Sequence, residues 1–593
     1  MTPATLQSGG VRVAVEGCGH GTLNAIYAAV ERSCKERKWD TVDLLIIGGD
    51  LQVRNTLLLQ SIGSFETRLA DSRQSVRHAQ DLAVMACPVK YRELGDFPDY
   101  YSGVRKAPYV TIFIGGNHEA SSHLWELFYG GWVAPNIYYM GAANVLRFGP
   151  LRIAGMSGIW KGFDYRKPHF ERLPFSDSDV RSFYHVREID VRKLLLLRTQ
   201  VDIGLSHDWP RGIEKHGDSE RLFRQKRDFR QESIDGTLGN VAAEYVLDRL
   251  RPPYWFSAHL HVKFAALKSF SAQRQLDSKQ QEQPHTEEAV AEPPQEANPD
   301  EIDLDLDDAD DDATGVRAHT KESVTKTPQE ANPDEIDLGL DDGDDNDDND
   351  VPVQPQNGTA PAPKVQEISE DESRETNKVS EELLAQLPAS FAKPPPRPKG
   401  TPGQPVPPGI TNTQVRFLAL DKCLPGRRFL QLCEVHPFDK EESVRYPASE
   451  SSPRYRLEYD PEWLAITRVF HRELVIGDPA SRVSADLGEA EYIPLIDRER
   501  QWVEDNIVKA GKLAVPENFS QTAPPYEQGT PGILHDQPDE YTNPQTAEFC
   551  LAVGSMAAVE DVVEGVAEVA EVDEEVDAVG EEGVDSVEDG NGT

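Results

Sequence analysis

The stretch Tyr109-Val110-Thr111-Ile112-Phe113-Ile114-Gly115-Gly116-Asn117-His118-Glu119 determines the fold expected for the first half of this sequence. Its apolar run predicts a buried strand, which two glycines bring to an end. An amide, an imidazole and a carboxylate follow directly. Because open α/β sheets place their sites at the carboxyl ends of strands, the stretch predicts a candidate site as well as a strand.

The same pattern of apolar strand, turn and helix recurs in the first 272 residues. Apolar periodicity predicts helices at residues 23–39 and 184–197. Further strands are expected at residues 11–15, 44–47, 151–156, 201–206 and 254–258. This alternation predicts an α/β fold whose sheet is covered on both faces.

Side chains that can bind a metal or transfer a proton follow five of these strands. They are Cys18, His20, Asp50, Asn117, His118, His207, His259 and His261. A single histidine after a strand is usually only hydrogen-bonded, and a Gly-Gly-Asp sequence is usually a turn. Five such ends in one register are hard to explain in this way, because clustered polar ligands would be unsatisfied without a cation.

The residue types at the strand ends fit a site for two metal ions. Asp50 can bridge two cations, and neutral imidazoles with the Asn117 amide oxygen can complete their shells. Such a pair holds a hydroxide at neutral pH and clamps the oxygens of an in-line displacement at phosphorus. His118 directly follows Asn117, where a general acid for the leaving oxygen is expected.

The order of these motifs resembles the calcineurin-like metallophosphoesterase superfamily, whose fold is a β-sandwich flanked by helices. One position departs from its pattern, because Cys18 stands where the superfamily usually has aspartate. This cysteine, within Val15-Glu16-Gly17-Cys18-Gly19-His20-Gly21, resembles one branch, the RNA lariat debranching enzymes. Five other stretches share the resemblance, namely residues 48–55, 116–121, 206–210, 258–264 and 413–425.

The resemblance implies two groups of metal ligands with Asp50 between them. One metal would be bound by Cys18, His20 and His261, and the other by Asn117, His207 and His259. A thiolate favours a softer ion than Mg²⁺, so Fe²⁺ or Zn²⁺ is expected and Mn²⁺ can substitute.

The implied activity is hydrolysis of the 2′-5′ phosphodiester at the branch point of excised intron lariat RNA. A metal-bound hydroxide would attack phosphorus, and His118 would protonate the 2′ leaving oxygen. The reaction linearises the intron for turnover after mRNA splicing, so the nucleus, with shuttling to the cytoplasm, is the expected location.

The expected substrate contacts rest on weaker observations. The aromatic segment 125–141 occupies the position of the family's lariat-recognition loop, and its rings either stack on bases or belong to the core. The candidates for substrate binding are Arg54, Trp132, Tyr138, Tyr139, Lys161, Tyr165 and Arg166. A basic run at residues 221–230 has three readings: an RNA contact, a nuclear import patch or a solvated helix face.

Charge and composition set limits on the function. The net charge is −41, but residues 1–272 hold 35 Lys and Arg against 30 Asp and Glu, and the remainder holds 26 against 72. The first part can therefore still meet a polyanion. Six scattered cysteines indicate a reduced intracellular compartment, and neither a secretory signal nor a membrane span is expected.

Composition divides the sequence into four expected parts. Residues 1–272 form the catalytic domain, and residues 411–545 form a small C-terminal debranching-enzyme domain. Residues 273–410 form a disordered acidic linker and residues 546–593 a disordered acidic tail. A decapeptide at residues 295–304 recurs at 329–338, either as a duplicated linker or as a tandem acidic docking motif. The expected form is a monomer whose acidic segments meet splicing-associated proteins.

Two other functions fit parts of the sequence. A metallophosphoesterase acting on another substrate, such as a DNA nuclease or a protein phosphatase, is disfavoured by Cys18 and by the C-terminal stretch. A non-catalytic RNA-binding adaptor would be expected to have lost ligands, yet every expected ligand is present.

Overall fold

A computed structural model describes residues 10–51, 76–87, 92, 95–270, 405–449, 453–471, 474–526 and 536–554. The predicted substrate contact Arg54 lies outside these residues. Both copies of the decapeptide and most of the predicted linker and tail also lie outside them.

Two mixed sheets form the centre of the fold. The first has the strand order β12-β1-β2-β3-β5-β4. Its strands are β1 Val11–Glu16, β2 Leu44–Ile47, β3 Val110–Phe113, β4 Gly131–Ala134, β5 Ile137–Tyr139 and β12 Leu430–Val435. The four inner strands run parallel, and the edge strands β12 and β4 are antiparallel to their neighbours.

The second sheet has the strand order β10-β11-β9-β8-β7-β6-β13. Its strands are β6 Ala143–Phe148, β7 Leu151–Met156, β8 Ile203–Ser206, β9 Tyr254–Ser257, β10 Phe264–Ser269, β11 Gln414–Ala419 and β13 Leu457–Tyr459. Strands β7, β8, β9 and β11 run parallel, so their carboxyl ends share one edge.

Alternating apolar side chains explain why the sheets pack face to face. Leu44 and Ile46 of β2 lie in the same buried cluster as Ile153 of β7, whereas Leu45 and Ile47 face the opposite side with the helices. Successive residues of a strand point to opposite faces, so a wholly apolar strand is suited to burial on both sides.

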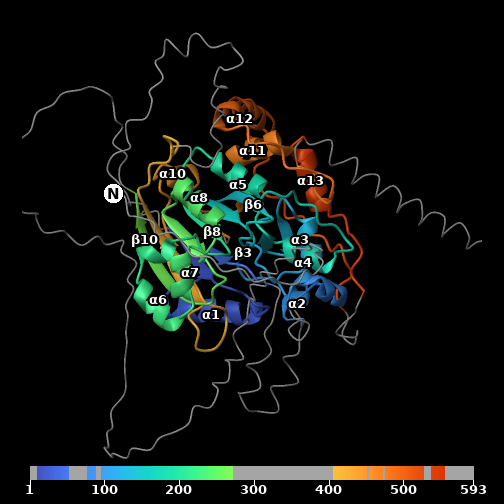
Figure 1. Ribbon diagram of the computed structural model, residues 1–593. Helices are drawn as coiled ribbons and strands as arrows, with labels where there is room; N and C mark the ends of the chain where they lie inside the picture. Colours follow the sequence, from blue (N-terminus) through green and yellow to red (C-terminus); the bar gives the residue numbers. More distant parts are fainter. Residues whose placement is uncertain are drawn as a thin grey trace, which may run out of the picture. The chain divides into compact units, whose positions relative to one another are not determined.

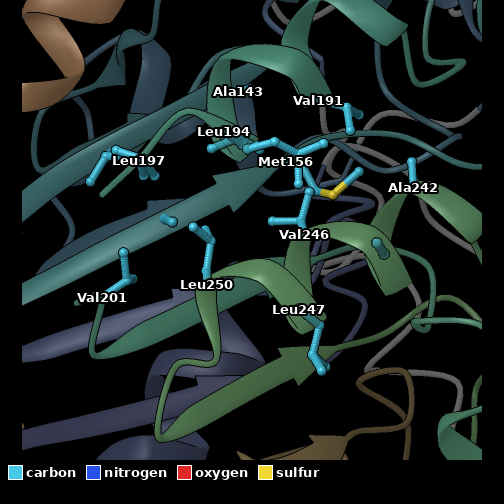
Figure 2. Close-up of a cluster of buried hydrophobic side chains, with 14 of the residues drawn as sticks. Ala143, Met156, Val191, Leu194, Leu197, Val201, Ala242, Val246, Leu247 and Leu250 are labelled. Atoms are coloured by element: carbon cyan, nitrogen blue, oxygen red, sulfur yellow. The ribbon is translucent and has the colours of Figure 1, made fainter. Parts of the chain in front are cut away.

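Helices cover the outer face of each sheet (Figure 1). Helices α1 Leu23–Arg37, α2 Phe97–Tyr101 and α3 Ser121–Glu126 pack on the first sheet. Helices α5 Glu188–Leu195, α8 Val241–Leu250 and α11 Pro461–His471 pack on the second. Figure 2 shows part of this second layer, where Leu194 and Val246 lie near Met156. The predicted β-sandwich flanked by helices is confirmed.

The remaining helices are shorter or lie further from the sheets. They are α4 Asp177–Ser182, α6 Ser219–Gln225, α7 Phe229–Asp235, α10 Glu442–Arg445, α12 Glu489–Val503 and α13 Pro544–Ala552, with 3₁₀ helices Ala79–Val84 and Ile213–His216 and a π-helix Glu504–Val508. None of the helices in the described ranges is long and apolar enough to cross a membrane.

The C-terminal region, residues 405–554 as far as they are described, shares both sheets with the N-terminal residues. Strand β12 pairs with β1 from Val11↔Val435 to Glu16↔Leu430, and β11 lies between β10 and β9. Among the described residues, the strands of this region form no separate sheet. The sandwich begun by the N-terminal residues is therefore completed by residues far along the sequence.

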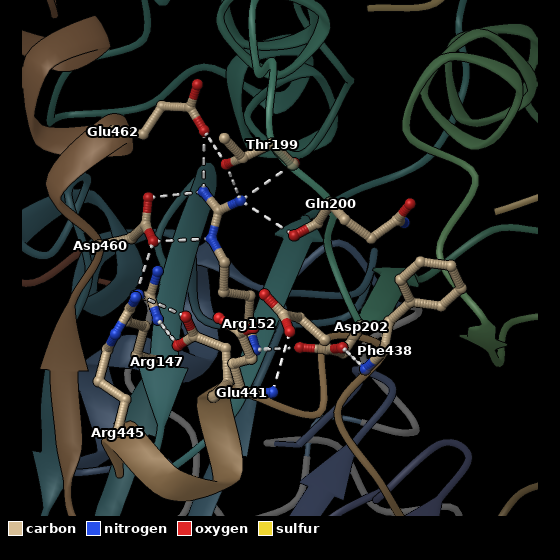
Figure 3. A network of polar contacts seen from close by, with 12 residues as sticks. Arg147, Arg152, Thr199, Gln200, Asp202, Phe438, Glu441, Arg445, Asp460 and Glu462 are labelled. Carbon is tan, nitrogen blue, oxygen red and sulfur yellow. Dashed lines mark hydrogen bonds and ion pairs between the residues drawn. The ribbon is translucent and has the colours of Figure 1, made fainter. Parts of the chain in front are cut away.

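A buried network of charges joins the two regions near the start of α11 (Figure 3). Arg152 on β7 donates to both oxygens of Asp460, at 2.8 and 2.7 Å, and to Glu462 at 3.1 Å. Arg147 on β6 also donates to Asp460 at 3.1 Å. Because these groups are shielded from water, the network fixes the position of α11 against the second sheet.

The structure corrects two predicted boundaries. The linker was expected to reach residue 410, but Ile410 is buried in the core beneath the second sheet's helices. The disordered tail was expected from residue 546, but α13 continues to Ala552, and Phe549 and Val553 belong to the same core. Both predictions are wrong for the described residues, because these apolar side chains are covered by a core that local composition does not reveal.

Candidate metal centre

The loops that follow five strands meet where the carboxyl ends of the two sheets adjoin. The loops after β1, β2 and β3 come from the first sheet, and those after β8 and β9 from the second. They bring together all eight predicted side chains, Cys18, His20, Asp50, Asn117, His118, His207, His259 and His261. Two sheets thus supply one site.

The first ligand group consists of Cys18, His20, Asp50 and His261. One possible ligand atom from each residue lies within 4.8 Å of those of the other three. The Nε2 atoms of His20 and His261 are 3.1 Å apart, and His20 Nε2 is 3.9 Å from Asp50 Oδ2. Sulfur, imidazole and carboxylate at this separation form a donor set that transition metals favour.

The second ligand group consists of Asp50, Asn117, His207 and His259. His207 Nε2 lies 3.3 Å from Asn117 Oδ1 and 3.6 Å from Asp50 Oδ2. The rings of His207 and His259 have centroids 5.0 Å apart. Asp50 therefore stands between the two groups, as a bridging ligand must.

Backbone hydrogen bonds orient the side chains of both groups. His207 Nδ1 donates to the carbonyl of Gly48 at 2.7 Å, which leaves its Nε2 lone pair facing Asp50. Asp50 Oδ1 accepts from the His118 amide at 3.0 Å, and Cys18 Sγ accepts from the His259 amide at 3.2 Å. Such bonds fix the ligands before any metal binds.

The backbone is strained at four of the ligands. His20, Asp50, His259 and His261 have φ angles of 42°, 51°, 59° and 50°. Non-glycine residues rarely adopt this left-handed conformation, and such strain gathers at functional sites. The neighbouring Gly116 has no alternative, since a Cβ there would lie 2.1 Å from Asp50 Oδ1.

The protonation states suit metal ligands. Burial lowers the pKa of His20 and of His259 to about 3 and that of His261 well below its usual value, so all three imidazoles are neutral. Burial would raise the pKa of Asp50, but the opposing effect of His207 and His118 is larger, so the carboxylate stays ionised. Burial and the charge of Asp50 raise the pKa of the Cys18 thiol.

One buried oxygen indicates that a cation fits this centre. Asp50 is 1 % exposed, and its Oδ2 accepts no hydrogen bond from any described residue. An ionised oxygen without a partner is costly in the interior. Because the ligand atoms of both groups surround it, the residues present fit two divalent cations.

His118 lies beside the ligand groups. It is 6 % exposed, and its Nε2 is 3.2 Å from Asn117 Nδ2. Its ring centroid is 6.5 Å from that of His20. The side chain is thus held within the centre by a ligand and by its own amide bond to Asp50, which is the placement expected of a proton donor.

The predicted phosphate contacts differ in position. Lys161 is half-buried, and its charge acts on Asp208, the residue after His207: burial raises the pKa of that carboxyl to about 6, and the charges of His207 and Lys161 oppose the rise. Tyr165 packs against Trp160, with ring centroids 4.9 Å apart, and Arg166 is exposed on the same loop. Of the three, Lys161 is the one whose charge acts on a ligand group, because it adds to burial and His207 in lowering the pKa of His259.

The structure corrects the predicted stacking residues in segment 125–141. This segment forms strands β4 and β5, and Trp132, Tyr138 and Tyr139 are buried in the core. Trp132 Nε1 donates to the Pro516 carbonyl at 2.7 Å, and its ring contacts that of Tyr138. Rings enclosed on strands cannot stack on RNA, so the prediction is wrong for these three residues.

Two contributions to the site were not predicted. Glu119 accepts from the amides of Leu51 at 2.8 Å and Gly116 at 3.3 Å, and so ties two ligand loops together. Its place directly after His118 was a usable signal. Lys422, from the C-terminal region, forms a backbone bridge with Cys18, and no local pattern marks it.

Known proteins are similar to this chain along most of its length. Residues 11–263 match the family model for calcineurin-like phosphoesterases, and residues 412–556 match that for the C-terminal domain of lariat debranching enzymes. A lariat debranching enzyme of Schizosaccharomyces pombe is 36% identical over 548 residues, covering 92% of this chain and 96% of that protein.

Two vertebrate proteins show the same similarity. Lariat debranching enzyme A of Xenopus laevis is 34% identical over 548 residues, covering 92% of this chain and 70% of that protein. The human lariat debranching enzyme is 50% identical over 262 residues, which cover 44% of each chain. The chain therefore belongs to the lariat debranching enzyme family, hydrolases that act on the branch phosphodiester of lariat RNA.

Proposed function

We propose that this chain cleaves the 2′-5′ branch linkage with two divalent cations held by its two ligand groups, and that His118 is the general acid. The observation that carries the proposal is the convergence of seven ligand side chains around the unpartnered Oδ2 of Asp50. Bound there, divalent cations supply Lewis-acid activation of water and of the scissile phosphate.

The side chains of the chain have separate tasks in this proposal. Asp50 holds the two groups in register, because it is the residue common to both. Asn117 contributes its Oδ1 to the second group while its Nδ2 contacts His118. His118, kept within the centre by these contacts, protonates the 2′ oxygen as it leaves.

Cys18 supports Fe²⁺ or Zn²⁺ as the ion of the first group, with Mn²⁺ able to substitute. Its thiol has a raised pKa because it is buried, so the thiolate forms only against a cation. Thiolate and imidazole ligands favour these ions over Mg²⁺, which prefers oxygen.

The test uses the full chain purified anaerobically. Its metal content is measured by elemental analysis, and its activity is assayed on a synthetic 2′-5′ branched RNA with Fe²⁺, Zn²⁺, Mn²⁺ or Mg²⁺. We expect about two ions per chain and cleavage at the branch with the thiophilic ions or Mn²⁺. No cleavage with any ion refutes the proposal, and faster cleavage of linear 3′-5′ RNA favours a different phosphodiesterase.

The same proposal covers the setting of the enzyme. We place it in the nucleus, with shuttling to the cytoplasm, because lariats arise from splicing, and we assign its acidic segments to splicing-associated proteins. All seven ligands come from one chain, which supports a monomer. Light scattering tests the monomer, and a dimer would contradict it. Imaging of the tagged protein tests the location, and a cytoplasmic signal would contradict it. Capture with the 295–338 segment tests the partners, and the absence of any captured splicing protein would contradict them.

A further inference from the structure

The turn between β11 and β12, residues 420–429, closes one side of the metal centre. The Cys18 amide donates to the Asp421 carbonyl at 3.4 Å, and the Cys423 amide donates to the Cys18 carbonyl at 3.2 Å. The Gly17 amide donates to the Phe429 carbonyl at 3.1 Å. The C-terminal region therefore holds the loop that carries a predicted ligand.

Three basic residues lie on this side of the centre. Lys422 and Arg428 belong to the turn, and Lys263 follows the ligand His261 by two residues. Lys422 forms a backbone bridge with Cys18, a member of the first ligand group. Lys422 is thus close to the first ligand group.

Lys263 and Arg428 both lie beside the start of β12. Lys263 Nζ donates to Gln431 Oε1 at 3.1 Å, and Arg428 precedes the first residue of this strand by two positions. Two basic side chains beside this strand, on the side of the centre that the turn closes, form a site suited to an anion.

Other basic residues nearby form ion pairs with carboxylates. Arg427, in the same turn, lies 3.5 Å from Asp421, and Lys268, on β10, lies 2.5 Å from Asp248. Within the described ranges, no carboxylate forms an ion pair with Lys263 or Arg428. The charge of these two residues is therefore available to a ligand.

We propose that Lys263 and Arg428 bind backbone phosphates of the branched RNA on the side of the metal centre that the C-terminal region forms. The proposal rests on the proposed function and names a further contact for the same substrate. Lysine and arginine are the residues that hold nucleic-acid backbones, and such contacts position the substrate without reading its bases. It also gives the C-terminal region a role in substrate binding.

The test measures how salt affects RNA binding. The variant Lys263→Gln/Arg428→Gln is compared with its parent, both carrying His118→Ala to slow turnover, by fluorescence anisotropy of a labelled 2′-5′ branched RNA. Each lost contact with a single-stranded phosphate reduces the slope of log K against log salt by about 0.7, so we expect a slope smaller by about 1.4. With His118 present, KM should rise about tenfold with kcat nearly unchanged, as expected for lost uniform binding.

The matched control removes the same two charges elsewhere. Lys268→Gln/Arg456→Gln affects residues that are paired with Asp248 and Glu458, and it should leave the slope at the parent's value. Metal content should be the same in all variants. An unchanged slope in the Lys263→Gln/Arg428→Gln variant, an equal decrease in the control, or loss of metal would each overturn the proposal.

The outcome is separable from that of the proposed function. If the unsubstituted chain cleaves no branched RNA, the proposed function fails. The anisotropy slopes measured with branched RNA and with linear RNA of equal length still report whether Lys263 and Arg428 bind phosphates. If the parent cleaves and the slope does not change, only the phosphate contact is refuted.

Discussion

The amide of His259 donates a hydrogen bond to the Sγ of Cys18 at 3.2 Å, and so joins the loop after β9 to the loop after β1. His259 belongs to the second ligand group, and Cys18 belongs to the first. The side chain at position 18 therefore links the two sheets at the metal centre, in addition to its proposed role as a ligand.

Replacing this thiol with a carboxylate should change which metal the centre prefers. In Cys18→Asp, a harder oxygen donor takes the place of sulfur, so the preference should move from Fe²⁺ or Zn²⁺ toward Mn²⁺ and Mg²⁺. Elemental analysis and branched-RNA cleavage with each ion measure the change. Cys34→Ser, which alters a buried thiol on α1, is the control, and an identical ion preference in Cys18→Asp and the parent would contradict the assignment.

Removing the proton donor should slow the reaction without emptying the site. His118→Gln is expected to lower kcat by about 10²–10⁴, because a general acid contributes that range. The metal content should match the parent's, since His118 is not assigned as a ligand. Single-turnover cleavage of branched RNA and elemental analysis measure the two effects, and a kcat within twofold of the parent's would refute the role of His118.

Removing the charge of Asp50 should empty the site, unlike the replacement of His118. Asp50→Asn keeps the shape of the side chain and the Oδ1 that accepts from the His118 amide, but it loses the negative charge between the two groups. We expect metal content to fall well below the parent's, together with activity. Asp208→Asn, at a buried carboxyl outside both groups, is the matched control. Full metal content in Asp50→Asn would show that this residue does not bridge.

The strands, and the polar residues that meet at their ends, could be predicted from the sequence because their signals are local. A wholly apolar run such as Leu44–Ile47 is buried on both faces wherever it lies, and the polar residues after it must lie at its carboxyl end. The convergence of the five ends follows from the parallel pairing of the inner strands.

The remaining features could not be predicted, because they depend on contacts between distant residues. Aromatic residues such as Trp132 and Tyr138 are typical both of a surface that stacks on bases and of a buried strand. Only the pairing of β4 with β5 decides between the two. Lys422 reaches the centre through the pairing of β11 with β9 and β10. Nothing near Lys422 in the sequence identifies Cys18 as its neighbour.

The stability of the protein should depend on pH through His123 of α3. Burial and the charge of Arg77 lower the pKa of this histidine to about 3, whereas the unfolded value is 6.5. The unfolded chain therefore binds one more proton below pH 6.5, and the contribution of His123 to stability decreases as the pH falls from 6.5 toward 3.

Denaturant unfolding at pH 7 and pH 5 measures this effect. At pH 5 the pKa of His123 in the unfolded chain lies 1.5 units above the pH. Keeping this side chain neutral in the fold therefore lowers the free energy of unfolding by about 2 kcal/mol. The decrease in stability between the two pH values should be smaller in His123→Gln than in the parent by about that amount. An equal decrease in both proteins would show that His123 is protonated in the fold.

The network around Arg152 should decide whether the C-terminal region stays in place (Figure 3). Asp460 is 1 % exposed and accepts from Arg152 and Arg147, so Asp460→Ala leaves two arginines short of a counter-charge in the interior. Breaking such a buried pair costs roughly 3–5 kcal/mol. Asp505→Asn, in an exposed pair with Lys509, should leave stability nearly unchanged.

Because α11 packs on the same sheet that carries His207 and His259, activity should be lost together with stability in Asp460→Ala. Denaturant unfolding and limited proteolysis measure the loss, and equal stabilities of the two variants would show that the network does not hold the regions together.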